Sequence, residues 1–118
     1  MPVRSLHSSI LKWPNKQDVD RAVRSWIRTQ KNHHNGVIRA GYFGSYADNS
    51  WGVGSDIDVV VIVDRDPLPF EGRSAGWDTS SLPVPTDLLV YTLAEWLRAI
   101  AAKSRFAEIL NNQTVWID

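Results

Sequence analysis

Three aspartates in the sequence have the neighbours and the spacing that a divalent-cation site needs. Asp56 and Asp58 stand two residues apart at the entrance to the β-branched run 59–63, and Asp87 opens a second apolar run at 87–91. Side chains two apart on a strand share a face, with their Cα atoms about 6.6–6.8 Å apart. Two carboxylates that close repel each other, and each raises the pKa of the other unless a cation lies between them.

A divalent cation would remove this repulsion. Carboxylate oxygens are the hard ligands that Mg²⁺ prefers, usually supplemented by substrate phosphates and water. If strand 87–91 lies beside strand 59–63, Asp87 brings a third carboxylate to the same place. Three carboxylates could hold two metal ions about 3.5–4 Å apart, a geometry that stabilises the attacking and leaving oxygens in phosphoryl or nucleotidyl transfer.

Each aspartate also has a simpler interpretation. An isolated D-x-D at a strand edge is typical of a turn with solvated charges, and an aspartate after Pro85 is an ordinary start to a strand. The residues upstream favour the chemical interpretation. Gly44 and Ser45 follow a predicted strand, where glycine allows close backbone approach, a helix N-terminus offers N–H groups to phosphate oxygens, and the serine hydroxyl adds a donor. All these features together are far more specific than any one of them.

In residues 44–47 (GSYA) and 55–58 (SDID) the sequence resembles the two halves of the signature of the minimal nucleotidyltransferases, small members of the DNA polymerase β superfamily. The resemblance implies a nucleotidyltransferase fold, an α/β (α+β) arrangement with helices packed on a small mixed sheet. It implies that Asp56, Asp58 and Asp87 are the catalytic residues and bind two Mg²⁺ ions, and that Gly44 and Ser45 hold the phosphates of the nucleotide. The implied reaction transfers NMP, most simply AMP from ATP, to an acceptor hydroxyl.

One departure from the signature leaves a second function open. Asp48 and Asn49 occupy the places where the family usually has a basic residue and a glycine. The alternative is therefore a non-catalytic binding subunit or antitoxin, acting through a basic stripe on its first helix. Minimal nucleotidyltransferases are commonly encoded beside a HEPN-type helical protein, so the resemblance also implies a protein partner. Nucleic acid is expected only as an acceptor.

The order of elements predicts a mixed α/β sheet with helices packed on it, α-β-β-β-α-α-β. Residues 1–14 are expected to form an arm and residues 15–118 a single domain. Helices are predicted after Asn15, after Thr92, and briefly at 106–110, with strands at 37–43, 59–63, 87–91 and 114–117. Residues 64–84, rich in proline and glycine, are predicted to be a long loop, either a lid or disordered.

The amino-acid composition argues against several classes of protein. The 118 residues carry 13 basic and 13 acidic side chains, and the even balance argues against a nonspecific nucleic-acid binder. The absence of cysteine and of a long apolar stretch predicts a cytoplasmic protein that neither spans a membrane nor uses thiolate chemistry. Trp51 and Trp77 could stack on a base, although packing is the preferred interpretation, and His7, His33 and His34 have no metal-ligand spacing.

Overall fold

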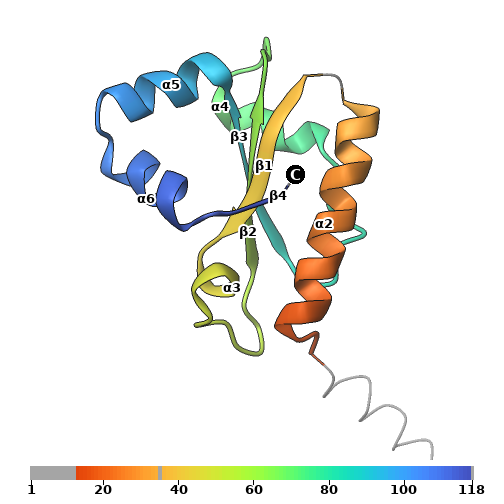
Figure 1. Cartoon of the computed structure of the whole chain (residues 1–118). Helices are drawn as coiled ribbons and strands as arrows, with labels where there is room; N and C mark the ends of the chain where they lie inside the picture. The colour runs from red at the N-terminus through yellow and green to blue at the C-terminus, as the bar shows by residue number, and fades with distance from the viewer. Residues whose placement is uncertain (1–12, 35, 118) are drawn as a thin grey trace, which may run out of the picture.

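The computed structural model describes residues 13–34 and 36–117. Its centre is a four-stranded sheet in the order β3-β2-β1-β4, with β2 and β3 parallel and β1 antiparallel to both β2 and β4. Helix α2 covers one face of this sheet, and helices α5 and α6 cover the other (Figure 1). The predicted mixed α/β class is therefore confirmed. Most of the predicted arm, residues 1–12, lies outside the described residues.

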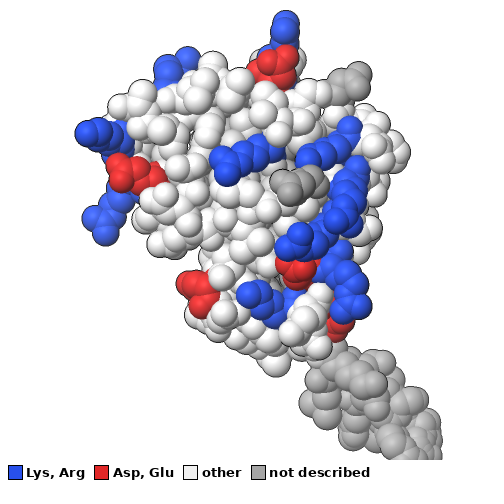
Figure 2. All heavy atoms as spheres, in the orientation of Figure 1, with Lys and Arg blue, Asp and Glu red and all other residues white. Residues whose placement is uncertain are grey.

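Helix α2 (Lys16–His33) begins where its sequence predicts. The side chain of Asn15 accepts a hydrogen bond from the backbone N–H of Asp18, and the carboxylate of Asp18 accepts one from the N–H of Asn15, a complete capping box. Its apolar stripe is buried against the sheet: Val19, Val23, Trp26 and Ile27. Basic side chains gather along α2 on the face shown in Figure 2. No helix among the described residues has the length and apolar character to cross a membrane.

The three long strands form the part of the sheet that matters for the site. They are β1 (Val37–Phe43), β2 (Ile57–Val63) and β3 (Thr86–Thr92), and β4 (Val115–Ile117) adds a short edge strand. β2 is buried on both faces, as its unbroken apolar run predicts. It starts two residues earlier than the sequence prediction, because Ile57 is fully buried and pairs with Thr86. Asp58 therefore lies inside the strand rather than at its entrance.

Two helices at the C-terminal end of the chain cover the second face of the sheet. α5 (Leu93–Ala101) starts from a capping box in which Thr92 and Glu95 bond each other's backbone N–H groups. α6 (Arg105–Gln113) is longer than predicted at both ends: it begins after Ser104, whose hydroxyl accepts a hydrogen bond from the N–H of Ala107, and it continues to Gln113. Buried side chains from both helices join those of β2 in one cluster: Val60, Ile62, Trp96 and Leu110.

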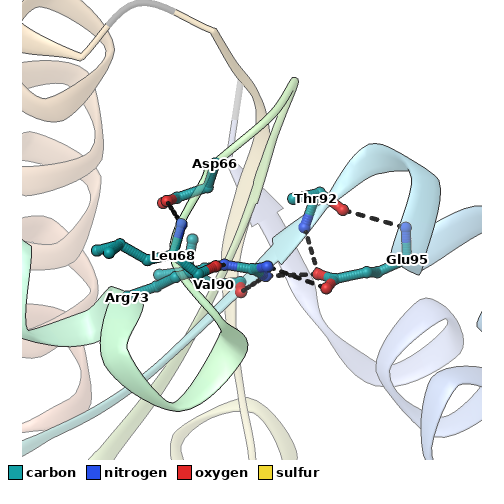
Figure 3. Close-up of polar contacts among 6 residues, drawn as sticks. All are labelled: Asp66, Leu68, Arg73, Val90, Thr92 and Glu95. Carbon is teal, nitrogen blue, oxygen red and sulfur yellow. Dashed lines mark hydrogen bonds and ion pairs between the residues drawn. The ribbon is translucent and has the colours of Figure 1, made fainter.

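The segment 64–84 is ordered, and it contains one turn of helix, α4 (Phe70–Arg73), and a 3-10 turn, η1 (Ser74–Gly76). Arg73, only 5% exposed, fastens it to the sheet (Figure 3). Its guanidinium donates to the carbonyls of Leu68 (2.7 Å) and Val90 (3.1 Å) and pairs with both carboxylate oxygens of Glu95. A disordered loop does not fit a segment held by a buried arginine in this way, and the lid stays a prediction.

Candidate active site

Asp58 and Asp87 lie directly opposite each other on β2 and β3. Neighbouring strands are about 4.8 Å apart, and side chains at paired positions of a parallel ladder project from the same face. This face is the one that α5 and α6 cover further along the strands, where Val60 and Ile62 follow Asp58 at alternate positions. The parallel pairing thus brings together two carboxylates that are 29 positions apart in the sequence.

Ionisation of the Asp58 carboxyl is disfavoured by its surroundings. Burial raises the pKa of the Asp58 carboxyl, and the negative charges of Asp87 and Asp56 raise it further. Asp56 is exposed and immediately precedes β2. The residues of the sequence-predicted trio are therefore near enough for Asp58 to experience the charge of the other two.

The carboxylates do not form a metal cage made of protein alone. Among residues 13–34 and 36–117, no group of three or more His, Asp or Glu side chains is close enough to hold a metal ion. Mg²⁺ is usually held by one or two carboxylates together with substrate phosphates rather than by an all-protein cage. Two adjacent carboxylates fit an ion of this kind, which would bind together with the phosphates of its nucleotide.

The loop after β1 passes against the same carboxylate. Gly44 has φ 76° and ψ −147°, a conformation that is essentially confined to glycine. A Cβ atom at this position would lie 2.3 Å from Oδ2 of Asp58, far inside the contact distance. Both the backbone conformation and the close approach therefore require glycine here, and they place the Gly44–Ser45 turn beside Asp58.

The turn continues into α3 (Ser45–Asp48), a single turn of helix that the predicted order of elements does not include. Asn49 ends it in the left-handed conformation, with φ 66°, which asparagine adopts more readily than most residues other than glycine. Asp48 is directed at its own loop, where its carboxylate accepts hydrogen bonds from the backbone N–H (2.9 Å) and hydroxyl (2.6 Å) of Ser50. These hydrogen bonds lower the pKa of Asp48.

Aromatic side chains anchor the loop that carries α3. Tyr46 is fully buried, its hydroxyl donates to the carbonyl of Ser55 (3.3 Å), and Trp13 donates to the same hydroxyl (3.2 Å). Trp51 stacks on Tyr46 with ring centroids 5.5 Å apart, so its contact in the structure is packing. Sequence reasoning allowed Trp13 to pack against the domain but gave Tyr46 no such role, because the partners of Tyr46 are set by the folded loop.

A recess of about 450 Å³ adjoins the two aspartates. We call it the β3 recess, and it is lined by the end of β1, by β2 and β3, and by the segment after α4: Phe43, Asp58, Ser74, Ala75, Trp77, Thr79, Thr86, Asp87, Leu88 and Leu89. Trp77 is half-buried and stacks on His34 with ring centroids 3.9 Å apart. Sequence reasoning did not connect Ser74 or Thr79 with the site, because only the folded segment 64–84 brings them to β3.

Comparisons with known proteins bear on the family and the fold of the chain. Residues 24–109 match the sequence profile of the nucleotidyltransferase domain. The fold is similar to the crystal structure of a Sulfolobus solfataricus protein provisionally assigned as a nucleotidyltransferase, with a TM-score of 0.58 and 15% identity over 70% of this chain and 75% of that chain. The comparison with curated proteins found no match. The profile covers most of the chain, which therefore belongs to the nucleotidyltransferase domain family, whose general reaction is the transfer of a nucleoside monophosphate.

Proposed function

We propose that this protein is a Mg²⁺-dependent nucleotidyltransferase that transfers NMP, most simply AMP from ATP, to an acceptor hydroxyl. The observation that carries this proposal is the pairing of Asp58 with Asp87 across β2 and β3, with Gly44 against Asp58. A purely structural sheet has no use for two adjacent carboxylates on one face, because their repulsion destabilises it. The acceptor hydroxyl could belong to a partner protein.

Each residue has a distinct role in this proposal. Asp56 and Asp58 bind the metal ions that accompany the triphosphate, and Asp87 contributes to the same metal site and faces the incoming hydroxyl. Gly44 and Ser45 hold the leaving phosphates, since the positive φ of Gly44 turns the backbone toward Asp58 and the start of α3. Two Mg²⁺ ions would supply charge neutralisation for the attacking and leaving oxygens. The chain itself contributes positioning, which is the main part of catalysis in this class of reaction.

A nucleotide titration tests the proposal. We expect ATP affinity that depends on Mg²⁺ in the wild-type protein and is lost in the Asp56→Asn and Asp58→Asn variants. Asp64→Asn is the matched control, because Asp64 is exposed just beyond the opposite end of β2. Affinity for ATP that is independent of Mg²⁺, or that survives in the carboxylate variants, would contradict the proposal. Incubation with labelled ATP, Mg²⁺ and a cell lysate would then identify the acceptor by its label.

A second candidate function is a binding subunit or antitoxin that retains the fold and docks on a HEPN-like helical partner. Asp48, in the place of a basic residue, favours it, and so does the stripe of basic residues on α2: Arg21, Arg24, Arg28 and Lys31. Arg21 and Arg24 are paired with Asp18 (3.5 Å) and Asp20 (2.7 Å) on the same helix, which reduces the net charge of that stripe.

Co-purification separates the two candidate functions. A stable complex that is unaffected by Asp58→Asn but lost on Arg28→Glu would support the binding subunit. Nucleotidyl transfer that requires Asp58 would support the enzyme. The exposed side chains of Leu97, Phe106 and Ile109 on α5 and α6 provide a further surface to vary in the same experiment.

A further inference from the structure

Two phenylalanines lie beside the proposed metal site, on the side away from β3. Phe43, the last residue of β1, pairs with Asp58 in the antiparallel register of β1 and β2. Directly opposite residues of paired strands share a face, with Cβ atoms about 4.5–5.5 Å apart. Phe43, Asp58 and Asp87 therefore form one row across three strands, on the face that α5 and α6 cover. Phe106, in the first turn of α6, meets the ring of Phe43 edge to face, with ring centroids 6.3 Å apart, and we call these two residues the phenylalanine pair.

Phe106 has an exposed surface that packing within the chain leaves unused. Its side chain is 47% exposed, whereas Ala107 and Leu110 of the same helix are buried. In an edge-to-face pair only one ring offers a face to its neighbour, so Phe43 covers at most one face of the Phe106 ring. A planar ligand stacked on the other face would remove apolar surface from water, which is favourable. The phenylalanine pair is therefore a candidate stacking surface within one strand of Asp58.

The proposed roles of the site residues indicate which part of a nucleotide reaches this surface. Gly44 and Ser45 would hold the leaving phosphates at the end of β1, and Asp87 on β3 would face the incoming hydroxyl. Attacking and leaving oxygens stand roughly in line through the transferred phosphorus. The nucleoside leaves that phosphorus to the side of this line, either toward solvent or along the face of the sheet. In Figure 1, α6 lies on this face above α3, so a nucleoside directed along the face would bring its base to Phe106.

We propose that α6 carries the site for the nucleobase: the base of the triphosphate stacks on Phe106, and Phe43 supports that ring from the sheet. A phenylalanine ring has no hydrogen-bonding group, so it recognises the area of a base rather than the pattern of donors and acceptors on its edge. Stacking is available to every base, and a purine offers two rings where a pyrimidine offers one. The phenylalanine pair therefore favours adenine and guanine alike over cytosine and uracil. This inference rests on the proposed function and adds to it the class of nucleotide.

Titration calorimetry with a probe that lacks a base tests this inference. ATP, GTP, CTP and inorganic tripolyphosphate are each titrated with Mg²⁺ into the whole chain, with no acceptor present. We expect ATP and GTP to bind with similar affinity, and CTP to bind at least about threefold more weakly. Phe106→Ala and Phe106→Leu should each weaken ATP binding about tenfold, remove the preference for ATP over CTP, and leave tripolyphosphate binding unchanged. Phe106→Trp keeps an aromatic surface and should retain the preference for purines.

Phe70 provides the matched control. It is 36% exposed and packs, with ring centroids 5.1 Å apart, on Tyr91, which lies four positions beyond Asp87 on β3. Phe70→Ala should leave all four affinities unchanged. The chain has three phenylalanines, so labelling with 4-fluorophenylalanine gives one fluorine NMR signal for each, assigned with Phe106→Leu and Phe70→Leu. In the otherwise unchanged chain, the Phe106 signal should shift with Mg²⁺–ATP and not with Mg²⁺–tripolyphosphate, and the Phe70 signal should shift with neither.

The outcomes separate this inference from the proposed function. Wild-type protein that binds Mg²⁺–ATP while Phe106→Ala keeps the full affinity, or while the Phe106 signal stays in place, overturns the nucleobase site and leaves the proposed function standing. Equal affinities for ATP and CTP in the wild type, or loss of tripolyphosphate binding in Phe106→Ala, overturn the nucleobase site in the same way. Wild-type protein that binds neither Mg²⁺–ATP nor Mg²⁺–tripolyphosphate overturns the proposed function, and the nucleobase site with it.

Discussion

The repulsion between Asp58 and Asp87 predicts that Asp58, a proposed catalytic residue, destabilises the protein when no metal ion is bound. Replacing Asp58 by Asn keeps the size and shape of the side chain and removes one of two adjacent negative charges. We expect Asp58→Asn to raise the free energy of unfolding at neutral pH in EDTA and to abolish any stabilisation by Mg²⁺ and ATP. Most substitutions of partly buried residues lower stability, so the sign of this effect is diagnostic.

The magnitude follows from the strand register. Paired strands about 4.8 Å apart place the two carboxylates roughly 5 Å apart, where unit charges repel by about 0.8 kcal/mol at the dielectric constant of water and by about 3 kcal/mol at an effective value of 20. Asp87 is exposed, so solvent screening brings the figure close to the lower limit. We therefore expect a gain of about 1 kcal/mol, or about 4 °C in Tm for a domain of this size.

The pH dependence follows from the direction of the pKa shift. The pKa of Asp58 is raised in the folded protein above its ordinary value of 3.8, so folding takes up a proton in the interval between the two values. The wild-type protein loses stability as the pH rises from 3.8 through the raised folded value. The advantage of Asp58→Asn is therefore complete at neutral pH, and it disappears below 3.8, where Asp58 is protonated in both states.

Urea denaturation followed by circular dichroism measures this effect. Wild type, Asp58→Asn and the control Asp64→Asn are compared in EDTA at neutral pH and at pH 3, and again with Mg²⁺ and ATP. Ligand at ten times its Kd should add about 1.4 kcal/mol to wild type and nothing to Asp58→Asn. If Asp58→Asn is no more stable than wild type at neutral pH in EDTA, then the two carboxylates do not repel as their register implies, and the reasoning from geometry to metal binding is refuted.

Further predictions concern the turn and the buried arginine. Gly44→Ala should cost about 1–3 kcal/mol and weaken Mg²⁺-dependent nucleotide binding, because its Cβ conflicts with both its own backbone and the carboxylate of Asp58; thermal unfolding and ATP titration measure the two effects. Arg73→Met should cost about 2 kcal/mol by breaking the pair between buried Arg73 and the partly exposed Glu95, measured by urea denaturation. The hydrogen bond from Arg73 lowers the pKa of Glu95 to about 2. The stability that this pair contributes is therefore present above pH 4.5 and is lost as the pH falls toward 2. Arg73→Met should reduce this pH dependence.

Each of these has a matched control. Gly52→Ala is the control for Gly44, because a Cβ at Gly52 meets no atom within 4 Å and its backbone has no positive φ. Equal stability losses in the two alanine variants would show that the turn tolerates a side chain. Arg65→Met is the control for Arg73, since the Arg65 side chain is 88% exposed. A loss at Arg65 as large as that at Arg73 would contradict the anchoring of segment 64–84 by Arg73 and Glu95.

Local patterns in the sequence were sufficient for most elements. The helix starts after Asn15 and Thr92 and the strand at 37–43 are confirmed, because caps and apolar periodicity act over a few residues and do not depend on the rest of the fold. The fold class followed from the order of those elements. The site residues were named from their spacing and from the resemblance, and their roles remain a prediction.

Boundaries and distant contacts required the tertiary structure. Ile57 belongs to β2 because it is buried and pairs with the neighbouring strand. Local residue propensities do not predict such a contact. Segment 64–84 has no periodicity, and its order comes from Arg73, whose acceptors lie five, seventeen and twenty-two positions away along the chain. Side-chain pairing at such separations depends on the packing of the whole sheet and its helices.

The sequence by itself determined that acidic side chains would enter a strand beside a glycine turn, because this follows from the residue types and their spacing. Only the tertiary structure decided that Asp87 stands opposite Asp58 and that Gly44 touches that carboxylate. It also decided that residues of segment 64–84 line the recess beside these carboxylates. The physical reason is that strand order and register depend on burying both faces of β2. That burial requires the neighbouring strands and the helices on both faces, which no local stretch of sequence contains.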